Sequence, residues 1–447
     1  MKNNPAEVLV YQGIEVLQDY LDDMLSLFGG EWVVIKPNLV KQYRENDPDE
    51  WKSVITSPSL IRQVARHCAE KVGEGGRVTI CDAPQTDSSF AAISALIDPD
   101  GYFERLSKET GALCELVDLR DQEWVNDGGV IVERRQLRGD PNGKIRFDLG
   151  PKSLFYRHPG EGRYYGADYE WKEVNYHHQD DRQEYLIAGT PIKCDVFINM
   201  PKLKTHKKTG VTLNLKNLVG INADKNWLPH HVEGPPSLGG DQFPDERTKQ
   251  KLERILVRAA RRIMLRFPGI GPRLMKVLRP GAESVFGSTS DVVRSGNWFG
   301  NNTTWRMALD LNRCLLFGNP DGTLRDQSQP KRYYSIVDGI IGMEGSGPMQ
   351  GDPVDSGVIL VGTDPVAVDM VAATIMGFDW RKIPIIREAF ALKSFPITAV
   401  APDDVTVYGN FGQFQGRLLS LIERNVPTLC FEPHFGWKGH IESNSCA

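Results

Sequence analysis

The side chains best suited to chemistry are concentrated in residues 199–220, with the sequence NMPKLKTHKKTGVTLNLKNLVG. Apolar residues precede and follow this stretch, so we expect a loop that is held against the core at the end of a strand. Ammonium groups mixed with hydroxyl and amide groups suit phosphate or carboxylate oxygens. A solvated basic loop without a ligand is the alternative. The candidate substrate-binding residues, two of which come from an earlier strand end, are Lys36, Asn38, Lys202, Lys204, Thr205, Lys216 and Asn217.

Acidic side chains and histidines near glycine-rich turns supply a second set of candidates. Asp338, Glu344, Asp364 and His206 are candidate catalytic residues, because carboxylates and imidazoles act as general acids and bases. Asp338 and Asp364, together with His230 and His231, are candidate ligands of a divalent metal such as Mg²⁺. The structural alternatives stay open. Asp364 precedes a proline and suits a helix N-cap, and adjacent histidines are often surface or structural residues.

The elements that must position these residues follow an α/β pattern. Apolar runs rich in β-branched residues alternate with helical patterns, which predicts a mainly parallel central sheet with helices on both faces. The expected strands are residues 32–35, 78–81, 113–119, 195–199, 335–338 and 358–361. A helix should begin at Thr56-Ser57-Pro58. Ligands bind beyond the carboxyl ends of parallel strands, and the candidate residues follow such ends.

We expect one large α/β domain over residues 1–447, interrupted twice. Residues from about 125 to 190 are polar and aromatic and predict an irregular excursion. A basic helical insertion is expected at about 240–310. Within it, residues 251–279 carry a local charge of +8, whereas the whole chain has a formal charge of −5. The helix is amphipathic, so burial in the core, docking to a protein partner and attachment to an anionic membrane surface all stay open.

Composition excludes several classes of protein. With 40% hydrophobic and 25% charged residues the chain is typical of a globular protein, and the negative net charge argues against a nucleic-acid partner. The sequence lacks a P-loop, a G-x-S-x-G elbow, an H-E-x-x-H motif and a dinucleotide fingerprint. We expect a cytoplasmic protein that associates at most peripherally with a membrane, because neither a signal peptide nor a spanning segment is evident. Seven scattered cysteines without a C-x-x-C pair predict reduced thiols, and no iron–sulfur cluster ligated by this chain alone.

Five motifs, in order along the chain, resemble the DUF362 family, which is named for its unknown function. They are IKPNLV, CDAP, NMPKLKTHKKTGVTLNLKNLVG, VDGIIGMEGSGP and GTDPVAVDMVAA, and they extend from about residue 30 to residue 385. The resemblance implies an α/β domain. Many members of the family also carry ferredoxin-type cysteine motifs, which this chain lacks, so a redox role does not carry over from them.

Two functions of different classes follow from these observations. The first is an enzyme that binds an anionic small substrate, with a divalent metal such as Mg²⁺ as its expected cofactor. The alternative is a non-catalytic accessory or binding protein that docks to a protein partner or a membrane surface through residues 251–279. An enzyme should gather the candidate residues in one deep pocket, whereas a binding module should spread them over a flat face.

Overall fold

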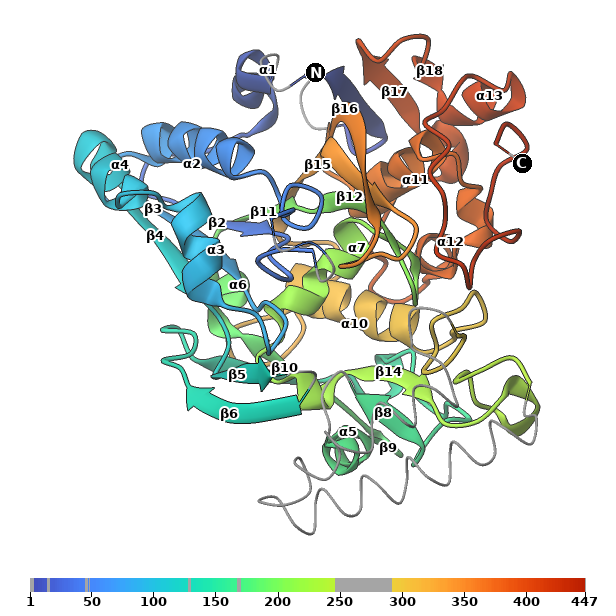
Figure 1. Ribbon diagram of the computed structural model, residues 1–447. Coiled ribbons are helices and arrows are strands. Elements are labelled where there is room, and N and C mark those ends of the chain that lie inside the picture. Colours follow the sequence, from blue (N-terminus) through green and yellow to red (C-terminus); the bar gives the residue numbers. More distant parts are fainter. Residues whose placement is uncertain are drawn as a thin grey trace.

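A computed structural model describes residues 4–13, 17–44, 47, 49–127, 130–166, 170–245 and 292–446 (Figure 1). Within this part of the chain, the central sheet has 11 strands in the order β18–β17–β1–β16–β15–β11–β2–β3–β4, and β12 and β13 are attached beside β15. These strands are β1 (Glu7–Gln12), β2 (Trp32–Pro37), β3 (Arg77–Asp82), β4 (Leu113–Asp118), β11 (Val196–Met200), β12 (Lys202–His206), β13 (Gly210–Thr212), β15 (Arg332–Glu344), β16 (Asp352–Gly362), β17 (Thr406–Gly409) and β18 (Gly416–Arg417).

The centre of this sheet is parallel. Strands β15, β11, β2, β3 and β4 pair side by side in one direction, and β16 and β1 add antiparallel pairings beside them. The six strands expected from apolar runs all occur, although β15 and β16 are longer than expected. The predicted fold class, α/β with a mainly parallel central sheet, is therefore confirmed.

Helices cover both faces of the sheet (Figure 1). Alternate residues of β2 point to opposite faces, as the two-residue period of a strand requires. Val33 and Ile35 pack in the core under α1 to α4, and Val34 packs in the core under α10 to α12. The helices are α1 (Leu17–Met24), α2 (Pro58–Val72), α3 (Phe90–Ile97), α4 (Tyr102–Thr110), α5 (Trp171–His177), α6 (Gly189–Lys193), α7 (Asn214–Asn217), α10 (Thr304–Phe317), α11 (Pro365–Ile375), α12 (Pro384–Ala391) and α13 (Leu418–Glu423).

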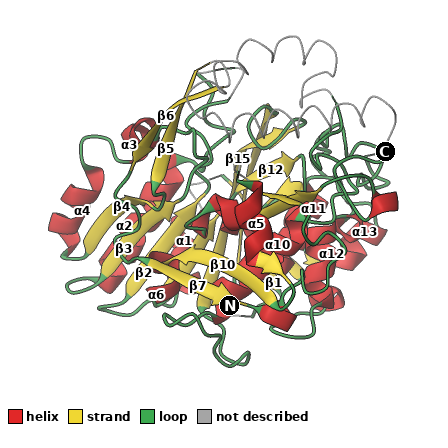
Figure 2. Ribbon diagram, turned by 90° about the horizontal axis from the view of Figure 1, so that it is seen from below, coloured by secondary structure: helices red, strands yellow, loops and turns green. Residues whose placement is uncertain are grey.

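The stretch at 125–190, which we expected to be irregular, contains regular structure. Its strands, with one that begins just before it, are β5 (Gln122–Asp127), β6 (Val130–Gln136), β7 (Lys144–Asp148), β8 (Tyr164–Gly166), β9 (His178–Gln179) and β10 (Arg182–Ala188). Figure 2 shows β5 and β6 as a ribbon that projects beyond the central sheet. Most of these strands are short, and exposed and buried residues alternate along β7. A strand that alternates in this way has no continuous apolar run, which is why the sequence pattern missed it. β10 is mostly buried and was missed as well.

Two further expectations concern the basic insertion and the cysteines. The expected basic insertion at about 240–310 is described only at its ends, and its basic segment, residues 251–279, lies outside the described residues. The expectation of reduced thiols throughout is wrong, because Cys430 and Cys446 form a disulfide, while the other five cysteines are buried and free. The two residues are 16 positions apart, and the fold brings their Cα atoms to 5.4 Å, a separation that a disulfide requires.

Among the described residues, no helix is both long enough and apolar enough to cross a bilayer.

Candidate functional site

A cavity of about 640 Å³ lies at the carboxyl ends of β2 and β3, against the β12–β13 hairpin and α7. We call it the lysine cavity because six lysines line it, Lys36, Lys204, Lys207, Lys208, Lys216 and Lys225. Among the described residues, two carboxylates line it, Asp82 and Asp87. The position agrees with the general rule for parallel sheets, in which ligands bind beyond the carboxyl ends of the strands.

The lysine-rich stretch is a strand hairpin and not the loop that we expected. β12 pairs in parallel with β15 and in antiparallel with β13, so it extends the sheet beyond the end of β11. Its register shifts between Lys202 and Lys204, and only Lys204 lines the cavity. Both side chains are buried, with at most 1% of their surface exposed. These ammonium groups are therefore fixed by the fold.

Two lysines of the cavity have no donor to spare. Lys36 Nζ lies 2.7 Å from Asp82 Oδ1 and donates to the Pro37 carbonyl (2.8 Å) and to Asn217 Oδ1 (3.3 Å). Lys204 Nζ donates to Asn38 Oδ1 and the Val54 carbonyl, both at 2.8 Å, and to the Pro348 carbonyl at 3.3 Å. An ammonium group has three donors, so three acceptors saturate each of them. Lys36 and Lys204 therefore shape the cavity and add charge without a free hydrogen bond.

Lys216 differs from these two lysines. Its ammonium group has neither a hydrogen bond nor an ion pair to any described residue, although the side chain lines the cavity and is partly exposed to it. Protein surrounds the group on most sides, and this burial, followed by the positive charge of Lys36, lowers the pKa of Lys216 to about 8. Lys216 is the cavity lysine best placed to give a hydrogen bond to a ligand.

His206 offers a second donor. Its Nδ1 accepts the backbone N–H groups of Lys208 (3.0 Å) and Thr209 (3.3 Å), so we assign the proton of the neutral ring to Nε2. Burial holds the pKa of His206 well below its usual range, and the positive charges of Lys216 and Lys207 lower it further. The imidazole is therefore neutral at pH 7. Its Nε2–H group has no partner among the described residues, and the side chain lines the cavity.

Buried amides connect the cavity wall to the core. Asn38 accepts from Lys204 and donates through Nδ2 to Asn217 Oδ1 at 2.8 Å. Asn217 in turn donates through Nδ2 to Asn199 Oδ1 at 2.7 Å. Each amide has a fixed orientation because both of its ends are used.

The network continues to the helix that carries Lys216. Tyr333 links Asn199 to Asn214, with distances of 2.8 and 3.1 Å at its hydroxyl oxygen. The carboxylate of Asp369 accepts three N–H groups of Asn214 and Leu215 at the start of α7, at 2.8 to 3.0 Å. Burial raises the pKa of Asp369 to about 7. A hydrogen-bonded path therefore holds α7, and with it Lys216, against α11.

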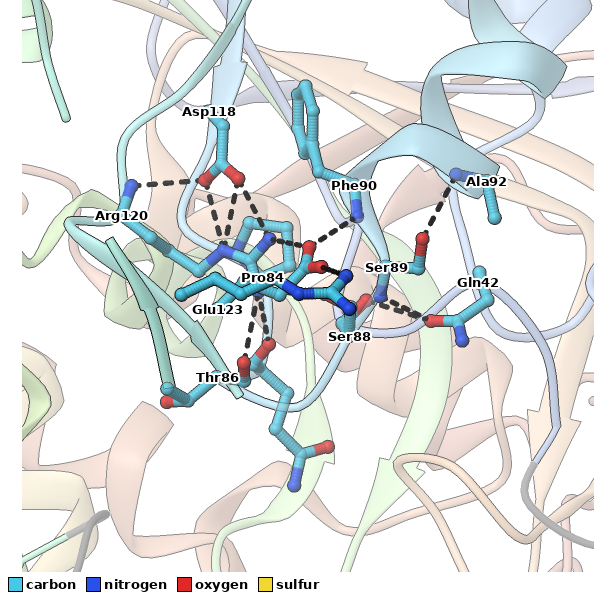
Figure 3. A network of polar contacts seen from close by, with 12 residues as sticks. Gln42, Pro84, Thr86, Ser88, Ser89, Phe90, Ala92, Asp118, Arg120 and Glu123 are labelled. Carbon is cyan, nitrogen blue, oxygen red and sulfur yellow. Dashed lines mark hydrogen bonds and ion pairs between the residues drawn. The ribbon is translucent and has the colours of Figure 1, made fainter. Parts of the chain in front are cut away.

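Arg120 positions another part of the wall of the lysine cavity. Figure 3 shows Arg120 between Asp118 and the segment that follows β3. Arg120 is 4% exposed, and its guanidinium donates to Asp118 and Glu123. Its Nη1 donates to three backbone carbonyls of residues 85–88, at 2.8 to 3.3 Å. Because Gln85, Thr86 and Asp87 line the cavity, this single side chain positions part of its wall.

The candidate residues of the sequence divide into two groups. The structure places Lys36, Asn38, Lys204, His206, Lys216, Asn217 and His230 on the lining of the lysine cavity. It does not place Lys202, Thr205, Asp338, Glu344, Asp364 or His231 there. Sequence reasoning missed Asp82 and Arg120, although the CDAP motif that contains Asp82 marks a strand end.

Asp338 lies beside the hairpin of β12 and β13, which we call the lysine hairpin, and its contacts are structural. Its Oδ2 is 2.9 Å from Lys202 Nζ and 2.6 Å from the backbone nitrogen of Ser57, and its Oδ1 accepts the N–H of Ile340. Both members of the Lys202–Asp338 ion pair are buried. The pair joins β12, β15 and the start of α2.

The other two acidic candidates also make local contacts. Glu344 accepts the backbone N–H of Glu432 at 2.7 Å. Asp364 caps α11 by accepting the N–H groups of Val366 and Ala367, both at 2.9 Å, which is the N-cap alternative that the sequence left open. Burial raises the pKa of Asp364 to about 6.

The candidate metal ligands do not gather at one point. His230 lines the lysine cavity and donates from Nδ1 to the Leu228 carbonyl, whereas His231 stacks on Tyr165. In the part of the chain that the structure describes, no group of three or more His, Cys, Asp or Glu side chains could hold a metal ion. The four candidate ligands, Asp338, Asp364, His230 and His231, therefore do not form one site among the described residues.

Comparisons with known proteins agree with the resemblance noted in the sequence. A thylakoid-associated protein of Synechocystis is 44% identical over 355 residues, and the match covers 79% of this chain and 66% of that protein. The chain thus spans about two thirds of the length of this relative. A crystal structure of a Thermotoga maritima protein has 9% sequence identity and a TM-score of 0.30, and the match covers 76% of this chain and 52% of that one.

The family assignment rests on the sequence profile of the domain of unknown function DUF362, which matches residues 33–136 and 153–374. This match includes β2, β3, the lysine hairpin and α7, and therefore most of the lysine cavity. The chain belongs to the DUF362 family.

Proposed function

We propose that this protein is an enzyme that binds a small anionic molecule, carrying phosphate or carboxylate groups, in the lysine cavity. The observation that carries the proposal is that two donors, the Lys216 ammonium and the His206 Nε2–H, have no partner in the described part of the chain and lie on one cavity lined by six lysines. A desolvated ammonium without an acceptor is costly, and an anionic ligand would offset that cost.

A third group supports the same proposal. The hydroxyl of Thr212 is buried, lines the cavity and has no hydrogen-bond partner in the described structure. Buried hydroxyl groups without partners are uncommon in folded proteins, and a ligand oxygen would supply the missing partner. These donors gather in one cavity of about 640 Å³, which favours an enzyme over a binding module with a flat docking face.

Anion binding should be coupled to proton uptake. The pKa of Lys216 is lowered to about 8 and that of Lys208 to about 7 in the empty cavity, mainly by burial. A bound anion favours the charged form of each lysine and therefore raises both pKa values. Affinity should decrease as the pH rises above about 8.

The test is isothermal titration calorimetry with pyrophosphate and with citrate at pH 7.5, in two buffers of different ionisation enthalpy. We expect wild type and Lys393→Gln, a control at an exposed lysine, to bind with the same affinity and with proton uptake. Lys216→Gln should weaken binding by at least about tenfold, the effect of losing one charged hydrogen bond. Equal binding by Lys216→Gln, or no binding to wild type, would overturn the proposal.

A second candidate function rests on the relative and on the charge of one segment. The Synechocystis protein is thylakoid-associated, and residues 251–279 of this chain carry a net charge of +8. We propose peripheral, salt-sensitive attachment to anionic membranes through this segment. Cosedimentation with anionic and neutral vesicles, at low and high salt, tests it. Equal recovery on both lipids, or on neither, would contradict it.

A further inference from the structure

Lys216 has the surroundings that favour a neutral amine. Its nitrogen faces the lysine cavity, and no described residue supplies an acceptor or a carboxylate that would hold it in the charged form. The nearby ammonium of Lys36 keeps its own charge partner, Asp82, at 2.7 Å. The positive charge of Lys36 disfavours a second positive charge on Lys216 in the same enclosed site.

The groups that face Lys216 come from three strands. Lys36 lies on β2, Lys204 and His206 lie on β12, and His230 lies on β14 (Pro229–Val232). The positive charge of Lys216 lowers the pKa values of Lys204, His206 and His230, which places all three within its electrostatic reach. None of these groups is an acid that could keep Lys216 charged.

We propose that Lys216 forms an imine with the carbonyl group of an anionic substrate, that is, a 2-oxo acid or a phosphorylated aldehyde or ketone. The proposal rests on the proposed function, because the anionic part of the substrate would bind to the other donors of the lysine cavity. Lys208 is suited to this role, since Nζ donates to two carbonyls, Ser295 (2.6 Å) and His230 (3.5 Å), and a bound anion favours the charged form, which has a third donor.

The chemistry balances without an oxidant or reductant. The lone pair of the Lys216 amine attacks the carbonyl carbon, and the π electrons of the C=O bond move to oxygen. One N–H proton passes to that oxygen, which gives a carbinolamine. The hydroxyl group then leaves with the second N–H proton as water, and a C=N bond replaces the C=O bond.

His206 has a defined part in this step. A neutral imidazole with its proton on Nε2 can donate a hydrogen bond to the carbonyl oxygen, and it stabilises the negative charge that develops there. Because burial and neighbouring cations keep its pKa low, His206 stays neutral and does not add a positive charge beside the attacking amine.

The experiment is reductive trapping with pyruvate and, separately, glyceraldehyde 3-phosphate, each with cyanoborohydride, followed by peptide mass spectrometry of the full chain. We expect the adduct on Lys216, at an extent at least about tenfold greater than on exposed Lys393, because a pKa lowered to about 8 increases the neutral fraction of the amine. Lys208, whose pKa is lowered to about 7, should stay unlabelled, because its nitrogen is held by two backbone carbonyls. Trapping should increase as the pH rises through about 8. Lactate keeps the carboxylate but lacks the ketone group of pyruvate, so it should compete with pyruvate and form no adduct.

Variants separate this inference from the proposed function. Lys216→Arg keeps the positive charge but cannot form an imine, so it should still bind lactate and lose the adduct. His206→Gln should reduce the rate of trapping while Lys216 stays the labelled site. Lactate binding without a Lys216 adduct, or an adduct spread equally over exposed lysines, would overturn the imine and leave anion binding intact. Failure of wild type to bind either ligand would overturn both. Locating the adduct in the wild-type protein does not require that any variant folds.

Discussion

Lys36 and Asp82 form a buried ion pair, with 2.7 Å between Nζ and Oδ1, and each residue comes from the carboxyl end of one of two adjacent parallel strands. The pair lies on the lining of the lysine cavity, and it accounts for one lysine whose charge is already balanced. Lys36 therefore has a charge partner on the cavity wall, whereas Lys216 has none among the described residues.

Gly220 makes this pair possible. A Cβ atom at Gly220 would overlap Asp82 Oδ1 and lie 2.7 Å from Lys36 Nζ. Gly220→Ala should therefore separate the pair and lower the free energy of unfolding by about 3 kcal/mol or more, measured by urea denaturation. Gly29→Ala is the control, because its nearest neighbour would be a carbonyl oxygen at 3.9 Å. Equal stability of the two variants would show that the pair is dispensable.

The Lys202–Asp338 pair should be structural. Lys202→Ala leaves the Asp338 carboxylate buried without its cation, which should cost about 3–5 kcal/mol in the free energy of unfolding. Lys438→Ala is a matched control, because Lys438 also lies 2.9 Å from a carboxylate, that of Glu432, but both side chains are exposed. Because solvent screens an exposed ion pair, it should cost far less than Lys202→Ala. Similar losses for the two variants would contradict this account.

The fold and part of the site were predictable from sequence, for identifiable reasons. Strands β2, β3, β11 and β15 are buried on both faces and appear as apolar runs, and the N-cap Asp364 precedes a proline. The buried lysines were not predictable as such. Lys202 finds its carboxylate 136 residues away, and a sequence gives no sign of that partner. For the same reason the hairpin was expected to be a loop held against the core. Arg120, whose contacts are mainly to backbone carbonyls and local carboxylates, carried no visible pattern.

Asp364 should make stability depend on pH. Its pKa in the folded state is raised to about 6 by burial, so the folded protein binds the proton more tightly than the unfolded chain does. The stabilising contribution is complete below pH 4 and is lost as the pH rises to about 6, a change of about 3 kcal/mol at most. Asn is also a good N-cap, so Asp364→Asn should remove this dependence and retain the helix.

The measurement is urea unfolding of wild type and Asp364→Asn at pH 4, 5, 6 and 7. A decrease from about pH 4 to 7 is expected in both proteins from Asp369, whose pKa is raised to about 7, so the wild-type curve should be the steeper of the two between pH 4 and 6. Parallel curves for the two proteins from pH 4 to 6 would refute the role of Asp364.

Arg120 should control the wall of the lysine cavity. Arg120→Lys keeps the charge but loses the planar group that reaches Asp118 and three carbonyls together, so residues 84–89 should exchange their amide hydrogens faster, and stability should decrease by on the order of 3 kcal/mol. Arg387→Lys, at an exposed ion pair with Glu388, is the control. Hydrogen exchange followed by mass spectrometry checks both variants, and unchanged exchange in residues 84–89 would exclude this positioning role.

The most direct test of the central claim, that the lysine cavity binds anions through its unpaired donors, is the crystal structure of the protein soaked in tungstate. Tungsten gives an anomalous signal that locates the anion without reference to side-chain positions. We expect one strong peak in the cavity, with a tungstate oxygen within about 3.2 Å of Lys216 Nζ and another within reach of His206 Nε2. A peak only at exposed lysines such as Lys393, with water in the cavity, would contradict the account.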